Sequence, residues 1–374
     1  MADVYLITLA LAAAIGLAAT LASLAASRTA QLASFFQQAR GVNERPRWGG
    51  LAMFLAFAVT PFIASAFSDQ AAELFSPKSG EFLAFLGACA LIVAVGFLDD
   101  WKLLPWQPKL LAQIGAASAV YAAGYRLDVV GLPWGPELPL SVMAPVVTVL
   151  WVVFFTNAIN LIDGRDGVAT GVAVLAAAAL AQIASNAGHP TVALLLVAMA
   201  GAGLGLLPFN LPPASVYVGD SGALLFGFIL GSLSIRAATG VTDAVFVAVP
   251  IVALGLPILD TGLAMLRRVL DHRHPLLGDE DHIHHRLEIA GFGPRGLLLV
   301  LYTVSGLFAA GALLLHHVHV FELEVAVLLS TLLVVAVVLT RLGYLLTLWN
   351  SASVIWLRRR LRWVEEPAFE SEGE

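Results

Sequence analysis

Apolar runs of about 20 residues recur along the whole chain, and they constrain its fold more than any other feature. A helix rises about 1.5 Å per residue, so each run is long enough to cross the roughly 30 Å of hydrocarbon in a bilayer. Charged residues make up only 12% of the 374 residues. Soluble domains carry about 25%. We therefore predict an all-α polytopic membrane protein.

Eleven of these runs qualify as membrane-spanning helices. The predicted spans are 4–26, 49–67, 82–98, 109–125, 141–159, 168–187, 190–207, 221–238, 244–266, 297–318 and 323–347. The first run lacks a basic segment ahead of it, so we interpret it as a retained span rather than a signal peptide. We expect one integral-membrane domain over 1–350, and over 351–374 a basic interfacial segment with an acidic, disordered tail. The single cysteine, Cys89, excludes an intrachain disulfide.

Lysine and arginine are divided very unequally between the two sets of alternate connecting segments. One set holds Arg28, Arg40, Arg45, Arg47, Lys102, Lys109, Arg165, Arg267, Arg268, Arg273, Arg286, Arg295, Arg358, Arg359, Arg360 and Arg362. The other set holds Lys78, Arg126 and Arg236. Because positive charge marks the cytoplasmic side of a membrane protein, we predict an N-terminus outside and a C-terminus in the cytoplasm.

Acidic, amide and imidazole side chains gather at the predicted cytoplasmic ends of the spans, where such groups indicate function. They are Asp99 and Asp100 in GFLDD, Asn157, Asn160, Asp163 and Asp166 in NAINLIDGRDG, Asn210 and Asp220 around VYVGDSG, Asp260 in PILDT, and His282, His284 and His285 in DHIHH. A regular helix could not aim all the polar residues of NAINLIDGRDG at one point. Gly164 and Gly167 therefore predict that this helix unwinds after Asp163, so that Asp166 turns back. In GDSG, a helix start offers free N–H groups to an anion, or to Asp220 itself as a cap.

Carboxylates gathered at a membrane surface need protons or cations between them. Oxygen ligands favour Mg²⁺, with Mn²⁺ as a substitute, and Mg²⁺ usually acts together with substrate phosphates. Lys109 and the Arg267–Arg268 pair supply positive charge for a diphosphate. We therefore predict phosphoryl transfer between a lipid phosphate and a soluble nucleotide, and we expect no nucleic-acid partner.

Three alternatives remain open at this point. Carboxylates in a membrane protein also couple ions in transporters, although these hold their charges near the bilayer centre. The H-x-H spacing of His282, His284 and His285 is compatible with zinc, although no cysteine or H-E-x-x-H motif accompanies it. Asp260 fits a structural role, as a cap or as a partner of Arg267, as well as it fits a site.

From about residue 40 to residue 290, the chain resembles the polyprenyl-phosphate N-acetylhexosamine-1-phosphate transferases, which form glycosyltransferase family 4. The resemblance rests on DDWKLLPWQPKLLAQ, NAINLIDGRDG, VYVGDSG, PILDT and DEDHIHHRL, in this order. The H-x-H-H form is more similar to the UDP-GlcNAc branch than to the phospho-MurNAc-pentapeptide transferase branch, which we keep as an alternative. The chain departs from the family pattern in ARGVNERPRWGG, where Asn43 stands near a usual histidine, at Ala223, where serine is frequent, and at Arg165, where an apolar residue is common.

The resemblance implies a function. Such an enzyme transfers a HexNAc-1-phosphate, here most similar to GlcNAc-1-phosphate, from a UDP-sugar to undecaprenyl phosphate and starts a lipid-linked cell-envelope glycan. It implies a multi-pass protein of the bacterial inner membrane, with the site on the cytoplasmic face and a homodimer as its assembly.

The resemblance also implies roles for residues. Asp220, with Asp99, would bind Mg²⁺, and Asp99 or Asp100 would assist the lipid phosphate as a base or a covalent nucleophile. Asp163 and Asp166, with Asn160, would shape the site and hold the nucleotide. The remaining substrate-binding residues would be Lys109, Asn157, Asn210, His282, His284, His285 and Arg286.

Overall fold

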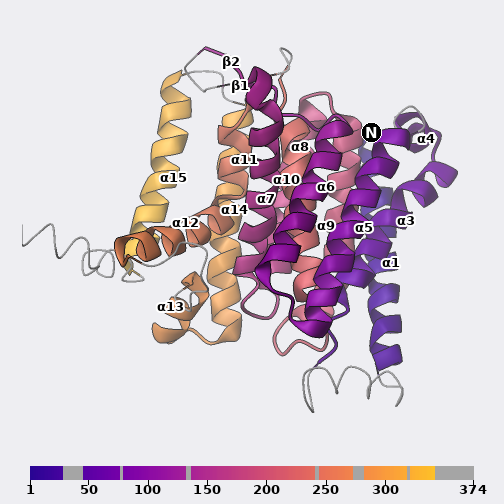
Figure 1. The fold of residues 1–374 in the computed structure, drawn as a ribbon, viewed down its shortest axis with the longest axis horizontal. Coiled ribbons are helices and arrows are strands. Elements are labelled where there is room, and N and C mark those ends of the chain that lie inside the picture. Colours follow the sequence, from indigo (N-terminus) through magenta and orange to yellow (C-terminus); the bar gives the residue numbers. More distant parts are fainter. Residues whose placement is uncertain are drawn as a thin grey trace, which may run out of the picture.

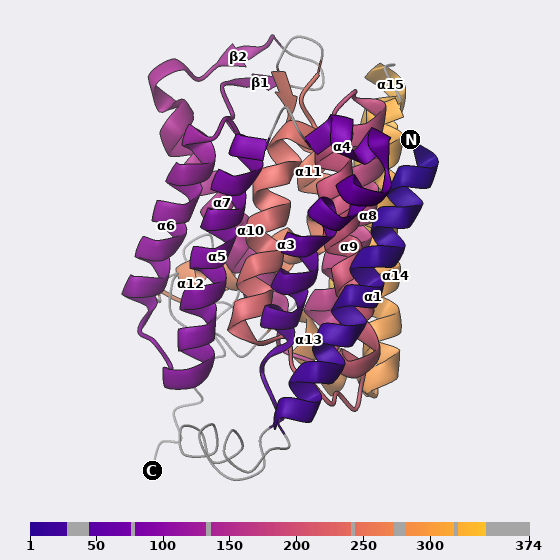
Figure 2. The same cartoon turned by 90° about the vertical axis from the view of Figure 1, so that its right-hand side faces the viewer.

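The protein is a bundle of long helices with one small sheet (Figures 1 and 2). The structure is a computed structural model that describes residues 1–27, 45–75, 79–131, 136–240, 244–272, 282–317 and 321–341. Its helices are α1 (Ala2–Ser27), α3 (Gly49–Phe67), α4 (Asp69–Phe75), α5 (Ser79–Lys102), α6 (Trp106–Ala122), α7 (Ala144–Ile162), α8 (Val168–Asn186), α9 (Pro190–Asn210), α10 (Gly219–Ala237), α11 (Ala248–Ala253), α12 (Gly255–Leu270), α13 (Ile283–Ile289), α14 (Pro294–His317) and α15 (Phe321–Arg341). The strands are β1 (Val129–Gly131), β2 (Leu138–Pro139) and β3 (Ala244–Phe246).

Helix α10 forms the centre of the bundle. In its most apolar stretch 89% of the residues are buried, compared with 28% in α1. Glycine, alanine and serine are frequent in α10, and small residues let neighbouring helices approach closely in a membrane protein. The outer helices expose leucine and valine instead, as a lipid-facing surface requires.

Among the described residues, eight helices are long and apolar enough to cross a membrane. Ten of the eleven predicted spans fall on helices, namely α1, α3, α5 to α10, α14 and α15. The prediction of an all-α polytopic membrane protein is therefore confirmed, whereas the number of eleven spans stays a prediction.

The prediction of one continuous helix over 244–266 is wrong. The segment forms strand β3, then α11, and then α12, with a break at Leu254. Pro257 explains the break, because it has no N–H for the carbonyl of Ala253 and its ring crowds that carbonyl. Figure 1 shows α12 lying crosswise to the long helices, so that it points toward α15. The predicted tail at 351–374 lies outside the described residues.

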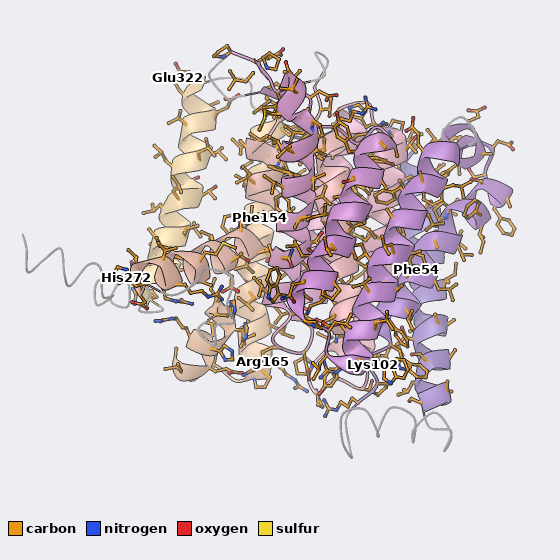
Figure 3. The ribbon with its side chains drawn as sticks, viewed as in Figure 1. Phe54, Lys102, Phe154, Arg165, His272 and Glu322 are labelled. Atoms are coloured by element: carbon orange, nitrogen blue, oxygen red, sulfur yellow. The ribbon has the colours of Figure 1, made fainter. Side chains whose placement is uncertain are left out.

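The two ends of the bundle differ in structure. At the end where the N-terminus lies, β1 pairs with β2 in antiparallel and with β3 in parallel register, as Val130 pairs with Leu138 and Val245. There Arg236 of α10 donates to the carbonyl of Gly124 (2.9 Å) and pairs with Glu81 (3.3 Å), which joins α10 to α5 and α6. Loop 163–167 and α13 lie at the opposite end; Figure 3 shows Arg165 and Lys102 there, far from Glu322.

Two glycines let α3 and α5 contact the first turn of α10. A Cβ on Gly50 of α3 would overlap the backbone nitrogen of Gly222, and a Cβ on Gly96 of α5 would lie 2.5 Å from Cα of Ser221. Backbone hydrogen bonds reinforce the contact, since the N–H groups of Gly49 and Gly50 donate to the carbonyls just before α10 (3.1 and 3.0 Å). The chain therefore brings the polar ends of α5 and α10 together.

We predict that Gly96→Ala destabilises the protein, because the new methyl group must push α5 away from α10. Such overpacking costs about 1–3 kcal/mol. The matched control is Gly87→Ala in the same helix, where a Cβ meets nothing within 4 Å. In thermal unfolding in detergent, the melting temperature of Gly96→Ala should be lower than that of the native protein. The melting temperature of the control should be unchanged. Equal melting temperatures for the two variants would contradict this packing argument.

Candidate active site

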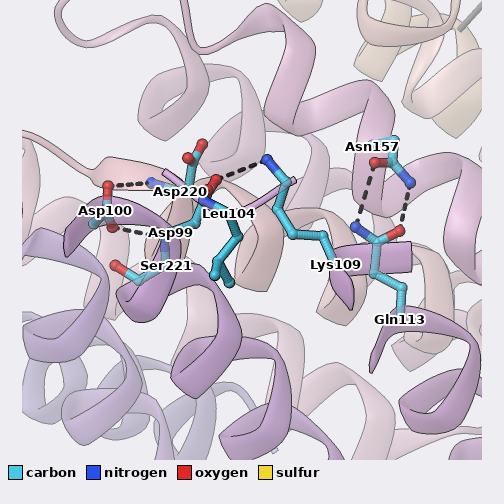
Figure 4. A network of polar contacts seen from close by, with 8 residues as sticks. All are labelled: Asp99, Asp100, Leu104, Lys109, Gln113, Asn157, Asp220 and Ser221. Carbon is cyan, nitrogen blue, oxygen red and sulfur yellow. Dashed lines mark hydrogen bonds and ion pairs between the residues drawn. The ribbon is translucent and has the colours of Figure 1, made fainter. Parts of the chain in front are cut away.

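Asp100 at the end of α5 holds the start of α10. Its two carboxylate oxygens accept hydrogen bonds from the N–H groups of Asp220 (2.9 Å) and Ser221 (3.0 Å), as Figure 4 shows. A helix N-terminus carries free N–H groups and partial positive charge, so it binds a carboxylate well. Gly219 has φ +71°, and a Cβ there would lie 2.5 Å from the Asp100 carboxylate. The free N–H groups expected in GDSG are therefore used by Asp100 and not by Asp220 as its own cap.

Asp99 and Asp220 face each other beside this junction. Asp99 is buried and accepts hydrogen bonds from Nζ of Lys109 (2.7 Å) and from the N–H of Leu104 (2.6 Å). The Asp220 carboxyl group lies next to it in Figure 4, and the two groups interact electrostatically. Two carboxylates this close repel each other unless a proton or a cation lies between them.

A cavity of about 330 Å³ opens next to Asp220. It is lined by Arg47, Asp163, Gly164, Arg165, Asp166, Asn210, Tyr217, Val218, Gly219 and Asp220. Four predicted site residues thus share one cavity, together with two arginines. The charges in its wall have both signs, as a site for a metal-bound phosphate requires.

The loop after α7 forms one wall of the cavity, and the predicted unwinding is confirmed. The helix ends at Ile162, and Gly167 takes φ +81° before α8 begins. Asp166 turns back and accepts a hydrogen bond from the N–H of Ala214 (2.9 Å). Asn210 fixes the loop, because its side-chain oxygen accepts from the N–H of Gly167 (3.2 Å) and from Thr170 (2.8 Å).

Asp163 lies in this loop with its side chain half-buried. Burial and the nearby carboxylates of Asp100 and Asp166 together raise the pKa of its carboxyl group to about 7, against the opposing charge of Arg47. Asp163 therefore holds or releases a proton near neutral pH, whereas an ordinary aspartate is ionised there.

The histidine segment packs against the same loop. Asp260 of α12 is buried and binds the start of α13, through Nδ1 of His282 (2.7 Å) and the N–H of Ile283 (2.7 Å). The ring of His284 lies directly on Gly164, where any Cβ would overlap it. Burial, together with the charge of His285, lowers the pKa of His284 to about 4, so its ring is neutral. Of the two roles considered for Asp260, the structure supports the structural one, since Asp260 positions α13.

Other predicted residues lie apart from the cavity wall. Asn157 exchanges hydrogen bonds with Gln113 (2.6 and 3.3 Å), which joins α7 to α6. The side-chain oxygen of Asn160 is buried and has no hydrogen-bond partner in the part of the chain that the structure describes. His285 lies 3.8 Å from Glu288, and Arg286 follows it on α13.

Comparison with known proteins agrees with this geometry. The model of a family described as glycosyl transferase family 4 matches residues 82–238, which cover most of α5 and all of α6 to α10. A Bacillus subtilis protein named "Probable undecaprenyl-phosphate N-acetylglucosaminyl 1-phosphate transferase" is 32% identical over 271 residues, 72% of this chain and 73% of the relative. The chain belongs to glycosyl transferase family 4. It is also similar to two further proteins, over different shares of its length. A decaprenyl-phosphate N-acetylglucosaminephosphotransferase of Mycolicibacterium smegmatis is 30% identical over 80% of this chain and 78% of the relative. A phospho-N-acetylmuramoyl-pentapeptide-transferase of Staphylococcus epidermidis is 31% identical over 45% of this chain and 50% of the relative.

The side chains of this family 4 site suit Mg²⁺ better than a metal ion that takes all of its ligands from the protein. Within the described residues, no group of three or more His, Cys, Asp or Glu side chains is placed to hold a metal ion. Mg²⁺ is usually held by one or two carboxylates, with waters and substrate phosphates as its other ligands. The facing carboxyl groups of Asp99 and Asp220 fit this mode.

Three residues of the family 4 site, Arg45, Arg47 and Tyr217, are not among the predicted site residues. Arg47 and Tyr217 line the cavity, and the guanidinium groups of Arg45 and Arg47 lie 5.8 and 5.9 Å from the ring centre of Tyr217. The N–H of Tyr217 donates to the carbonyl of Pro46 (2.9 Å), which holds this segment beside the residues that precede α10. In the sequence these arginines belong to RPRWGG, where their charge predicts orientation and not a place in the site. Asn43 lies outside the described residues.

We predict that Asp163 makes the stability of the metal-free protein depend on pH. Because its pKa of about 7 exceeds the usual 3.8, the folded protein keeps this proton over a range in which the unfolded chain has lost it. This contribution favours folding at low pH and declines as the pH rises from about 4 to about 7. Melting temperatures measured from pH 5 to 8 in a chelating buffer should fall more steeply for the native protein than for Asp163→Asn. Parallel curves for the two proteins would show that Asp163 titrates normally.

Proposed function

We propose that this family 4 enzyme transfers N-acetylglucosamine 1-phosphate from UDP-N-acetylglucosamine to undecaprenyl phosphate, with release of UMP. The observation that carries the proposal is the Asp99–Asp220 carboxyl pair, which lies beside Lys109 and a cavity walled by Arg47, at one end of a membrane bundle. Carboxylates for a metal ion and cations for phosphates are the groups that phosphoryl transfer needs.

The relatives support this choice of substrates. The Bacillus and Mycolicibacterium proteins, whose names specify a polyprenyl phosphate and N-acetylglucosamine, match over 72% and 80% of this chain. The pentapeptide transferase matches over only 45%. We therefore prefer a donor with a simple N-acetylhexosamine, and the product would start a lipid-linked glycan of the cell envelope.

The position of the site suits substrates from two phases. We propose that the chain crosses a bacterial inner membrane eleven times, the ninth time through the broken segment of β3, α11 and α12, with the N-terminus outside, the C-terminus inside and the site on the cytoplasmic face. The unequal distribution of positive charge supports this orientation, since Lys102 and Arg165 lie at the site end and Arg47 lines the cavity there. A water-soluble donor would then enter from the cytoplasm, while the lipid phosphate would arrive from the bilayer. A homodimer stays a prediction.

Asp99 and Asp220 would hold Mg²⁺, or Mn²⁺ in its place. When bound, this ion would offset the negative charge of the donor diphosphate. Lys109 is fixed by Asp99 and would stabilise phosphate charge on one side, and Arg47 would do so from the cavity wall. Asp166 and Asn210 keep the loop after α7 in place, so that Asp163 stays at the cavity.

The proposed reaction is a single exchange of phosphorus–oxygen bonds. An oxygen of the lipid phosphate attacks the sugar-linked phosphorus of the donor and forms a new diphosphate bond. The bond from this phosphorus to the oxygen bridging the two donor phosphates breaks, and UMP leaves with that oxygen. The acceptor phosphate is ionised at neutral pH, so the attack itself needs no base, and the role of Asp99 is to hold charge rather than to remove a proton.

The transporter alternative has less support. Ion-coupled transporters place their binding carboxylates near the bilayer midplane. Here Asp99 and Asp100 end α5, Asp220 begins α10 on the same side, and the cavity is lined from that end of the bundle.

We predict that the purified protein releases UMP only when UDP-N-acetylglucosamine, undecaprenyl phosphate and Mg²⁺ are all present. Asp220→Asn should lower the rate by about 10²–10³-fold, because it removes charge that holds the ion at the diphosphate. Glu73→Gln, an exposed change on α4 at the other end of the bundle, should have no effect. UMP release that does not need the lipid, or no release with any UDP-sugar, would contradict the proposal.

A further inference from the structure

Arg165 and Glu288 form an ion pair between two segments that are 123 residues apart in the chain. Nε of Arg165 donates to Oε1 of Glu288, and Nη2 donates to Oε2 (2.6 Å), so the two side chains bind as parallel forks. Arg165 lies in the loop after α7, while Glu288 lies on α13. Forked pairs of this kind are more specific in geometry than single-contact ion pairs.

The guanidinium group of Arg165 is held by acceptors within the protein. Its third nitrogen, Nη1, donates to the carbonyl of Gly164 (2.9 Å). Each of the three nitrogens thus donates to a protein acceptor, which leaves only two of the five N–H groups of Arg165 for any other ligand. Glu288 has both oxygens engaged as well, and Arg165 lowers the pKa of Glu288, so the pair stays charged at neutral pH.

Helix α13 is held at both ends by side chains from elsewhere. Asp260 binds its first residues, and the Arg165–Glu288 pair binds its last turn. Between these ties, the ring of His284 lies on Gly164, and its Nδ1 is buried without a hydrogen-bond partner in the described part of the chain. If the second tie is lost, α13 can turn about Asp260 and lift the histidines from the loop.

The pair also divides two cavities. Arg165 and Asp166 line both the cavity of about 330 Å³ beside Asp220 and a neighbouring cavity of about 660 Å³. Glu288 lines only the larger one, together with residues at the start of α14. The ion pair thus forms part of the wall on one side of the site.

We propose that Arg165 and Glu288 are positioning residues, which hold the histidine helix α13 against the loop after α7 and thereby set the affinity for the nucleotide-sugar donor. This inference rests on the proposed function. It concerns binding rather than the bond exchange, because the two side chains bind each other and thereby join α13 to the loop after α7.

The test is a double-mutant cycle of Arg165→Met and Glu288→Gln, read as KM for the donor and kcat. An exposed ion pair changes an equilibrium by up to about fivefold, so each single variant should raise KM by about three- to fivefold, with kcat within about twofold. The double variant should match the singles, because both changes remove the same pair.

Arg165→Lys, which keeps the charge but loses the forked hydrogen bonds, should have a KM between those of the native protein and Arg165→Met. Arg126→Met, an exposed arginine at the other end of the bundle, is the matched control.

Hydrogen exchange of the peptide covering 282–290 supplies the second readout. The inference predicts faster exchange in both single variants and in the double variant. A raised KM with unchanged exchange would mean that Arg165 contacts the donor directly, and faster exchange with unchanged KM would mean a structural role only. Either result, or KM changes that multiply in the double variant, overturns the proposal.

The proposed function and this inference can fail separately. If the native protein turns over no UDP-sugar, the proposed function fails, and UDP affinity measured by calorimetry replaces KM in the same cycle. Coupled losses of UDP affinity with faster exchange in α13 would still support the positioning role. UDP affinity that is equal in all variants would overturn it.

Discussion

The site depends on the hydrogen bonds between the Asp100 carboxylate and the first N–H groups of α10. Asp99 precedes Asp100 in the chain, so fixing Asp100 also fixes Asp99 beside Asp220. The two adjacent aspartates therefore have different tasks: Asp100 joins two helices, and Asp99 faces the polar end of the site with Lys109. This junction requires a close helix contact, which Gly50 and Gly96 permit because a side chain there would overlap α10.

Around this junction, segments from distant parts of the sequence each contribute one wall of the site. Residues 45–50 place two arginines over Tyr217, and the loop after α7 is fixed by Asn210 and by the N–H of Ala214. Helix α13 is tied on by Asp260 and by the Arg165–Glu288 pair. Most of these hydrogen bonds and ion pairs hold segments in place and do not involve the groups proposed to react. The charged groups proposed to act on the metal ion and the phosphates are those of Asp99, Asp220, Lys109 and Arg47.

Hydropathy and local motifs predict much of this structure. Hydropathy indicates which segments lie in lipid, and glycines in the motifs indicate where the backbone can leave a helix. The long helices, the unwinding at Gly164 and Gly167, and the gathering of carboxylates at one end all follow from the sequence. Hydropathy does not predict the break at Leu254, because an apolar run has nearly the same hydropathy whether or not it contains Pro257. The different tasks of Asp99 and Asp100, the arginines at Tyr217 and the Arg165–Glu288 pair depend on partners that are far away in the sequence, and no spacing rule records them.

The central claim is that Asp99 and Asp220 share a divalent cation with the donor diphosphate. Binding of Mn²⁺, followed by electron paramagnetic resonance with and without UDP, tests it most directly. Native protein should bind Mn²⁺ more tightly when UDP is present, and Asp99→Asn and Asp220→Asn should each weaken binding by at least about tenfold, as loss of a metal-site contact does. Glu73→Gln should bind as the native protein does. If both aspartate variants bound Mn²⁺ with native affinity in the presence of UDP, the cation would lie elsewhere and the account of the site would be wrong.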